Sequence, residues 1–366
     1  MLNRFLMKII STSYSKTEEY SDPKEWLQKI SFYTGILEEL SRQHEVISFE
    51  RINYEGGLKY KCVQYYFIKL QRKVVRFPSQ MHSLIKQFQP DVVFVNGSIF
   101  PLQVIQLRLK LGRKVKIIIL HRAERPFTGI KRYLQKLADQ CVNSYLFSSI
   151  EFRDAWKRNI DVKKMHEIMQ ASSGFCPADR SLAREITNAN GDPVFLWVGR
   201  LEENKDPLTV VKAFIEFLHH QPSAVLYMIY QTNELFNIIN GLVERNNAGS
   251  SIRLIGKVQH PQLQDWYNSA DLIISGSHYE GGGTVITEAM SCGCIPVVTD
   301  ISSFRALTAN GKCGFLYKAG NEGDLLTTLL QTREIDIKKE KEKVLCHFND
   351  QLSFEAIGRK INAIIS

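Results

Sequence analysis

Short apolar runs alternate along the chain with longer segments in which apolar residues recur at helical spacing. In the first half, residues 8–11, 46–49, 92–96, 116–121 and 144–148 have the length and composition of buried strands. Helical patterns lie between these runs, for example over residues 26–42, 75–87 and 100–111. Strands that alternate with helices are typical of a parallel α/β sheet.

A second series of the same kind follows a polar stretch at residues 181–193, which ends in the turn formers Asn-Gly-Asp-Pro. Its predicted strands are residues 194–198, 224–230, 252–255, 272–275, 295–298 and 314–317. We therefore expect two Rossmann-like, doubly wound domains, 1–185 and 186–352, facing a cleft. A final helix at about 353–366 could pack back on the first domain.

Composition agrees with a globular protein of two domains, since 44% of the 366 residues are hydrophobic. The longest apolar runs, 117–120 and 194–198, are too short to cross a membrane. Residues 1–10 are too short for a signal peptide, and Met7 could be the true start. The seven cysteines are scattered and are interpreted as small buried hydrophobes. These features predict a cytoplasmic protein.

Charge is distributed unevenly: residues 51–150 carry 18 basic and 4 acidic side chains, in a chain with a formal net charge of +9. A basic front half suggests an anionic partner, which could be a phosphorylated acceptor, a membrane surface or nucleic acid. The alternative is a solvated basic surface without a specific role.

Polar residues follow the predicted strand 194–198. The strand breaks at Gly199, and Arg200 and Lys205 lie in the polar loop that follows. Asp206 is then the expected N-cap of a helix and Pro207 its first residue. Two cations beside a helix start suit a diphosphate, although an exposed salt-bridged loop explains them equally well.

The segment Glu280-Gly-Gly-Gly-Thr-Val-Ile-Thr-Glu288 follows the predicted strand 272–275 and enters a short helix. Consecutive glycines let backbone amides approach a ligand, and a helix start offers free N–H groups to an anion. Glu280 and Glu288 could accept hydrogen bonds from sugar and ribose hydroxyls. The alternative is an ordinary flexible loop with a helix-stabilising glutamate.

His121 ends another predicted strand, where it could donate a hydrogen bond to a sugar hydroxyl or to a phosphate. Taken by itself, a capping or structural histidine is the better interpretation. Arg122 and Arg125 add positive charge beside it.

At these positions the sequence resembles the retaining glycosyltransferases of family 4, which have the GT-B fold. The resemblance rests on Val-Gly199-Arg200-Leu-x-x-x-Lys205, on Asp271-Leu-Ile-Ile-Ser, and on Glu280 to Glu288 followed by Ala-Met-x-Cys-Gly-x-Pro-Val-Val. It covers nearly all of residues 194–320 and is weaker in residues 1–180.

The resemblance implies a role for each matching position, with 186–352 as the nucleotide-sugar donor domain and 1–185 as the acceptor side. The implied catalytic residues are Glu280 at the donor sugar, Arg200 and Lys205 at the diphosphate, and His121 from the opposite domain. The implied donor-binding residues are Gly199, Lys257, Val258, Gly281, Gly282, Gly283, Thr284, Val285 and Glu288. Glu288 would bind the ribose, and Lys257 and Val258 would flank the base.

The implied reaction is transfer of a sugar from a nucleotide diphosphate sugar to an acceptor with retention of anomeric configuration. Neither a metal nor another cofactor is implied, because Arg200, Lys205 and a helix terminus can neutralise a departing diphosphate. The expected partners are the donor and a glycan or lipid-linked acceptor, with peripheral contact to the inner membrane face through residues 51–150 and no nucleic acid. Bacterial surface polysaccharide or glycolipid synthesis would fit.

Other classes remain as alternatives: an epimerase-like GT-B enzyme, a phosphorylase, a non-catalytic nucleotide-sugar-binding protein, or a dinucleotide oxidoreductase. A dinucleotide oxidoreductase is disfavoured, because no Gly-x-Gly-x-x-Gly motif follows a predicted strand in this sequence. The sequence also departs from the family pattern at two loops. Residues 11–16 contain no glycine, and Ile-Tyr-Gln-Thr at 229–232 stands where members tend to have glycines.

Overall fold

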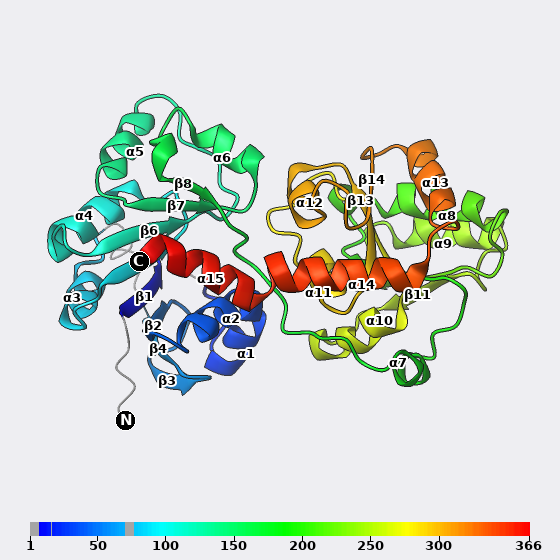
Figure 1. Ribbon diagram of the computed structural model, residues 1–366, viewed down its shortest axis with the longest axis horizontal. Coiled ribbons are helices and arrows are strands. Elements are labelled where there is room, and N and C mark those ends of the chain that lie inside the picture. Colours follow the sequence, from blue (N-terminus) through cyan, green and yellow to red (C-terminus); the bar gives the residue numbers. More distant parts are fainter. Residues whose placement is uncertain (1–6, 16, 70–76) are drawn as a thin grey trace. The chain divides into compact units, whose positions relative to one another are not determined.

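The computed structural model describes residues 7–15, 17–69 and 77–366, which form two compact units. Unit 1 consists of the chain up to Ser172 together with Phe354–Ser366, and unit 2 consists of Ser173–Ser353. Each unit is built on its own twisted sheet with helices on it (Figure 1).

The sheet of unit 1 has eight strands in the order β3-β4-β2-β1-β5-β6-β7-β8. The strands are β1 (Lys8–Ser13), β2 (Glu45–Glu50), β3 (Gly56–Tyr60), β4 (Val63–Phe67), β5 (Val92–Asn96), β6 (Lys116–Leu120), β7 (Ser144–Phe147) and β8 (Met165–Glu167). All neighbours pair in parallel except β3 and β4, which form an antiparallel hairpin at the edge. The central strands are buried and rich in Val, Ile and Phe, as a sheet covered on both faces requires.

The helices of unit 1 are α1 (Pro23–Lys29), α2 (Ser31–Leu40), α3 (Ser79–Gln87), α4 (Pro101–Leu111), α5 (Lys131–Asp139), α6 (Ile150–Trp156) and the C-terminal α15 (Phe354–Ile365). Helix α15, red in Figure 1, lies against α2. The Phe354 ring occupies the space above Gly35, where an added Cβ would lie 2.3 Å from the ring. Glycine at position 35 therefore lets the last helix approach α2.

The sheet of unit 2 has six parallel strands in the order β11-β10-β9-β12-β13-β14. They are β9 (Val194–Gly199), β10 (Val225–Tyr230), β11 (Ile252–Gly256), β12 (Leu272–Ser275), β13 (Ile295–Thr299) and β14 (Phe315–Tyr317). In order along the chain these are strands 3-2-1-4-5-6, so the winding reverses between β9 and β12. Ligands of such sheets bind outside the carboxyl ends of the strands at this reversal.

The helices of unit 2 are α7 (Arg180–Thr187), α8 (Pro207–Leu218), α9 (Phe236–Arg245), α10 (Leu263–Ser269), α11 (Thr284–Ser291), α12 (Ser302–Leu307), α13 (Glu322–Gln331) and α14 (Ile337–His347). Short 3-10 turns precede two of them, at Glu203–Lys205 and His260–Gln262. Helix α8 begins as predicted, with Asp206 accepting a 3.2 Å hydrogen bond from Thr209 N–H and Pro207 in the first turn.

The predicted strands are confirmed to within a few residues, but two expectations about connections are wrong and one hairpin was missed. Residues 26–42 form two helices that meet at Ile30 rather than one. The hairpin β3–β4 was not predicted. The polar stretch 181–193 is no linker, because most of it forms α7, which packs on α10, and the units divide at Ser172 and Ser173 instead of 185 and 186. The predicted helix start at residue 75 lies outside the described residues.

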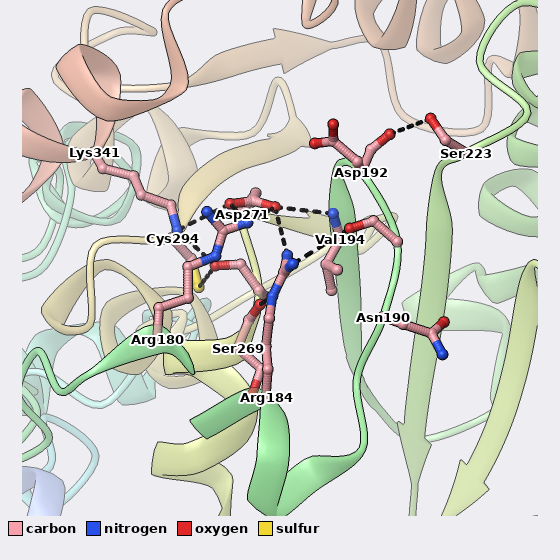
Figure 2. A network of polar contacts seen from close by, with 12 residues as sticks. Arg180, Arg184, Asn190, Asp192, Val194, Ser223, Ser269, Asp271, Cys294 and Lys341 are labelled. Carbon is pink, nitrogen blue, oxygen red and sulfur yellow. Dashed lines mark hydrogen bonds and ion pairs between the residues drawn. The ribbon is translucent and has the colours of Figure 1, made fainter. Parts of the chain in front are cut away.

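A buried carboxylate at the amino ends of the unit 2 strands explains why α7 belongs to this unit. Asp271 precedes β12 and is almost fully buried, and three cations converge on it (Figure 2). Arg180 of α7 lies 2.6 Å from the carboxylate, Arg184 of the same helix 3.2 Å, and Lys341 of α14 3.1 Å. The carboxylate also accepts a 2.9 Å hydrogen bond from the N–H of Val194, the first residue of β9. One side chain thus joins two helices to two strands.

We expect Asp271→Asn to lower the free energy of unfolding by about 3 kcal/mol. Breaking a buried ion pair costs about 3–5 kcal/mol, and the lower end applies because the three cations are partly exposed and can turn to water. Urea unfolding of the full chain, followed by tryptophan fluorescence, measures the effect. The matched control is Asp300→Asn, which breaks an exposed pair with Arg305 and should cost less than about 1 kcal/mol. Equal unfolding midpoints for the two variants would contradict the role assigned to Asp271.

Candidate functional site

Two loops meet where the winding of the unit 2 sheet reverses. One follows β9 and the other follows β12, and His278 N–H donates a 2.9 Å hydrogen bond to the carbonyl of Asn204 across them. Gly276 lies so close to the first loop that an added Cβ would be 2.7 Å from the carbonyl oxygen of Asp206. The two backbones can therefore approach only with glycine at this position.

The loops bring Lys205 and Glu280 together as an ion pair, with both side chains about four-fifths buried. The same Glu280 oxygen accepts a 2.9 Å hydrogen bond from the Ser277 hydroxyl. The pair borders a pocket that is also lined by Val198 of β9 and by Gly283, Thr284 and Val285 at the start of α11. Residues that are far apart in the sequence and that the sequence motifs predict for the site thus line one pocket.

Helix α11 begins at this pocket with its first backbone N–H groups uncapped by a side chain. Its N-cap is Gly283 with φ +58°, a conformation that other residues adopt only at a cost. A Cβ at Gly283 would also lie 2.7 Å from the side chain of Leu307. Gly281 and Gly282 precede it and are partly exposed. A helix start of this kind attracts anions through its free N–H groups and its dipole.

Arg200 follows β9 directly, after Gly199, and more than half of its side chain is exposed. It forms a 2.9 Å ion pair with Glu202 two residues later. On the other side of the loop, Asp206 lies 3.2 Å from His278 Nε2. Arg200 is therefore close in the chain to the Lys205–Glu280 pair but points into solvent, where it is free to reorient toward an anion.

Glu288 lies in α11 and is buried, unlike an ordinary surface glutamate of a helix. His260 Nε2 lies 2.8 Å from one carboxylate oxygen, and the Tyr267 hydroxyl donates a 3.0 Å hydrogen bond to the other. Since a carboxylate only accepts, His260 carries a proton on Nε2. Burial and then the Glu288 charge raise the pKa of Tyr267 well above its usual value, so the phenol stays protonated.

His260 and Tyr267 were not identified from the sequence. Each oxygen of Glu288 has about two lone-pair sites, so these two donors leave capacity for two further hydroxyls. The sequence contains one indication for His260. This residue lies just after Lys257 and Val258, the turn that the resemblance assigns to the nucleotide base. Lys257 is exposed and Val258 is partly buried, both directly after β11. Their role at a base stays a prediction.

His121 ends β6 in unit 1 as predicted, but its contacts are those of a structural histidine. Its Nε2–H donates a 3.0 Å hydrogen bond to the carbonyl of Glu124, and its Nδ1 accepts a 3.2 Å hydrogen bond from Ala123 N–H. The ring is buried against Phe147 and Trp156. Burial lowers the pKa of His121 to about 4, so it is neutral. Both nitrogens serve the turn that follows β6, and the predicted hydrogen bond to a sugar finds no support in these contacts.

The arrangement in unit 2 offers a definite chemistry. Lys205 and the start of α11 present positive charge to the pocket, and Glu280 and Glu288 present acceptors for hydroxyl groups. A ligand that combines a phosphate with hydroxylated rings matches these groups. Among the described residues no three His, Cys, Asp or Glu side chains are grouped to hold a metal ion. Independence from metals stays a prediction.

Comparison with known proteins finds similarity to one family over the second half of the chain. Residues 179–343 match the family model of glycosyl transferases group 1. D-inositol 3-phosphate glycosyltransferase 2 of Catenulispora acidiphila is 26% identical over 170 residues, which cover 42% of this chain and 38% of that protein. D-inositol 3-phosphate glycosyltransferase of Paenarthrobacter aurescens is 25% identical over 60% of this chain and 58% of its own length. The chain thus spans well under two thirds of these relatives.

Solved structures similar to this chain extend over nearly its whole length. A glycosyltransferase from Rickettsia africae superposes with a TM-score of 0.77 at 16% identity, covering 99% of this chain and 98% of that one. Anabaena HepE in complex with UDP gives a TM-score of 0.73 at 13% identity, covering 98% and 99%. Together with the two α/β units, these likenesses confirm the GT-B fold class. No helix among the described residues is long and apolar enough to cross a membrane.

The neutral state of His121 makes the stability of the fold dependent on pH. The unfolded histidine takes a proton near 6.5, whereas the folded one resists until about 4. Its contribution is therefore complete above 6.5 and is lost as the pH falls from 6.5 toward 4. We expect the loss to approach about 3 kcal/mol, since each pKa unit corresponds to about 1.4 kcal/mol.

Urea unfolding at several pH values tests this expectation with His121→Gln, whose side-chain amide can still donate to the Glu124 carbonyl. This variant should lose less stability on acidification than the wild type. His219→Gln, at an exposed site after α8, is the matched control and should follow the wild-type curve. Parallel curves for all three proteins would refute the assignment.

Proposed function

We propose that this chain, whose residues 179–343 match the family model of glycosyl transferases group 1 and which has the GT-B fold, transfers a sugar from a nucleotide diphosphate sugar to an acceptor. The observation that carries the proposal is the Lys205–Glu280 pair beside the uncapped start of α11, in a pocket at the reversal of the sheet. A cation, a carboxylate and free backbone N–H groups gather there within one unit.

In the proposed complex the diphosphate lies against the start of α11 and Lys205, and Arg200 turns toward it from solvent. Binding of the phosphates releases Lys205 from Glu280, which frees that carboxylate to accept hydrogen bonds from the sugar. Glu288 accepts the ribose hydroxyls with the lone pairs that His260 and Tyr267 leave open. Charge that develops on the leaving diphosphate is stabilised by Lys205, Arg200 and the helix start, without a metal ion.

We further propose that the transfer retains anomeric configuration, with the leaving phosphate accepting the proton of the acceptor. In the proposed complex the donor hydroxyls occupy both carboxylates, Glu280 keeps its hydrogen bond from Ser277, and Glu288 keeps those from His260 and Tyr267, so neither serves as a separate base. The proposed acceptor is a glycan or a lipid-linked glycan of bacterial surface polysaccharide or glycolipid synthesis. The relatives named D-inositol 3-phosphate glycosyltransferases make a phosphorylated polyol the second acceptor to test.

Two other classes share the same pocket, and product analysis separates them. An epimerase-like enzyme would return an altered nucleotide sugar without release of the nucleoside diphosphate. A binding protein would bind the nucleotide sugar and leave it intact. Incubation with UDP-, GDP- and ADP-sugars, followed by chromatography of nucleotides and glycans, identifies both the reaction and the base. A transferase releases the nucleoside diphosphate in proportion to acceptor glycosylation.

We expect Lys205→Ala and Glu280→Ala each to lower kcat by at least about 100-fold, the scale of losing one preorganised group at a developing charge. Both variants should stay folded, because the partner left behind keeps about a fifth of its side chain exposed and can turn to water. The matched controls are Lys212→Ala and Glu216→Ala on the exposed face of α8, which should keep wild-type turnover. Near-normal turnover of either site variant would remove the proposed assignment.

His260→Ala should weaken donor binding more than it slows turnover, since it loosens the carboxylate that we assign to the ribose. An increase in KM for the donor of about 10-fold corresponds to one lost charge-assisted hydrogen bond. His260→Gln, which can still donate to Glu288, should recover much of the affinity. The thermal shift on adding the nucleoside diphosphate measures the same effect without catalysis. Equal loss in both variants would point to a packing role instead.

A further inference from the structure

Unit 2 begins with residues 173–178, which we call the entry segment, and hydrogen bonds tie this segment to two helices of the unit. The Ser291 hydroxyl of α11 donates a 3.0 Å hydrogen bond to the Ser173 hydroxyl. The buried side-chain amide of Asn268 in α10 donates a 3.1 Å hydrogen bond to the Cys176 carbonyl. The same amide accepts a 2.7 Å hydrogen bond from the backbone N–H two residues further along. The entry segment is therefore held near both of its ends.

Phe175, in the middle of the entry segment, packs on both of the side chains that donate to Glu288. Its ring centroid lies 5.1 Å from that of His260, with 31° between the ring planes. The Tyr267 ring lies 6.0 Å away, at 47°. The Phe175 N–H donates a 3.0 Å hydrogen bond to the Ser173 hydroxyl, which fixes the backbone behind the ring. Aromatic rings attract each other at these separations, so one phenyl ring supports both donors.

His260 is the donor whose position depends more on this packing. Tyr267 lies within α10 and is fully buried, so the fold itself holds its hydroxyl in place. His260 lies in the 3-10 turn before α10, and 45% of its side chain is exposed. An exposed imidazole can exchange its hydrogen bond to Glu288 for one to water at little cost. The Phe175 ring occupies the space on one face of the imidazole and so limits the rotamers that His260 can adopt.

We propose that Phe175 is a positioning residue for the donor ribose, because it holds His260 on Glu288 and so keeps that carboxylate oriented. This inference rests on the proposed function, which assigns Glu288 to the ribose hydroxyls. A carboxylate that is already held in place loses less conformational freedom when hydroxyls bind to it. A loosened carboxylate weakens the bonds to the ribose and leaves the contacts of the diphosphate unchanged. Phe175 therefore sets the preference for nucleotides that carry ribose hydroxyls.

The test is calorimetric binding of UDP, GDP and ADP to the full chain, each compared with its 2′,3′-dideoxy counterpart. The ratio of the two dissociation constants isolates the contribution of the ribose hydroxyls. Phe175→Ala should reduce this ratio about 5-fold, the scale of one lost aromatic contact. Its affinity for the dideoxynucleotide should stay at the wild-type value, which also shows that the variant is folded. Phe175→Tyr keeps the ring and should keep the wild-type ratio.

Two further variants separate this role from general packing. Phe152 of α6 in unit 1 is partly buried and lies 5.4 Å from the His121 ring, with 43° between the planes. Phe152→Ala removes a matching contact between a phenyl ring and an imidazole and should leave the ratio unchanged. In a His260→Ala background, Phe175→Ala should cause no additional fall in the ratio, because its effect passes through His260.

Three binding results would overturn the proposal. The first is an unchanged ratio in Phe175→Ala. The second is an equal loss of affinity for both kinds of nucleotide, which would mean that Phe175 only packs the unit. The third is an additional fall of the ratio in the His260→Ala background, which would mean that Phe175 acts on the ribose by another route.

A measurement without ligand keeps this inference separate from the proposed function. The imidazole N–H proton of His260 that is bonded to Glu288 should give a downfield NMR signal, assigned by its loss in His260→Gln. The signal should persist in Phe175→Tyr and be lost to solvent exchange in Phe175→Ala. That pattern in a protein that binds no nucleoside diphosphate would contradict the proposed function and leave the support of His260 by Phe175 intact. An unchanged signal in Phe175→Ala would overturn this inference alone.

Discussion

The parallel pairing of β9 with β12 is the constraint on which the candidate site depends. The two strands pair only through Phe195 with Leu272 and Leu196 with Ile273. Beyond these residues they separate, because α8 and α11 leave them toward different neighbours in the sheet order. The pocket occupies the space so created, with Val198 and Ser275 in its wall. Asp271 secures the other ends of the same two strands, so the charge network in Figure 2 and the pocket share one support.

The strands that frame the pocket could be predicted from the sequence, because each buried strand is an unbroken run of apolar residues. Prediction failed where tertiary contacts decide between a helix and a loop. Residues 180–187 are polar on most sides, and their helix is stabilised by ion pairs from Arg180 and Arg184 to a residue more than eighty positions away. The hairpin β3–β4 is a short edge with few buried residues, so its pattern is weak.

Much of the candidate site could be predicted, because its residues directly follow strands whose carboxyl ends must meet. For this reason Lys205 and Glu280 line the same pocket. The support of Glu288 could not be found, since His260 and Tyr267 reach it from another strand connection and only the fold sets the distance. His121 shows the opposite case: its position at a strand end was right, but its partners are the backbone of its own turn, and spacing alone does not distinguish a ligand contact from a cap.

The two units use charge in different ways. In unit 2 the cations near the pocket are paired with carboxylates, Lys205 with Glu280 and Arg200 with Glu202. At the amino ends of the strands, the three cations of Figure 2 are paired with Asp271. Such pairs fix geometry and can exchange a carboxylate for a phosphate at little electrostatic cost. On α4, α5 and the segment between them in unit 1, the exposed cations outnumber the carboxylates: Glu124 is turned inward, and Asp139 at the end of α5 pairs with Lys164. Unpaired surface cations of that kind do not fix the positions of neighbouring groups. It acts at a distance, which suits capture of an extended anionic surface rather than recognition of one small ligand.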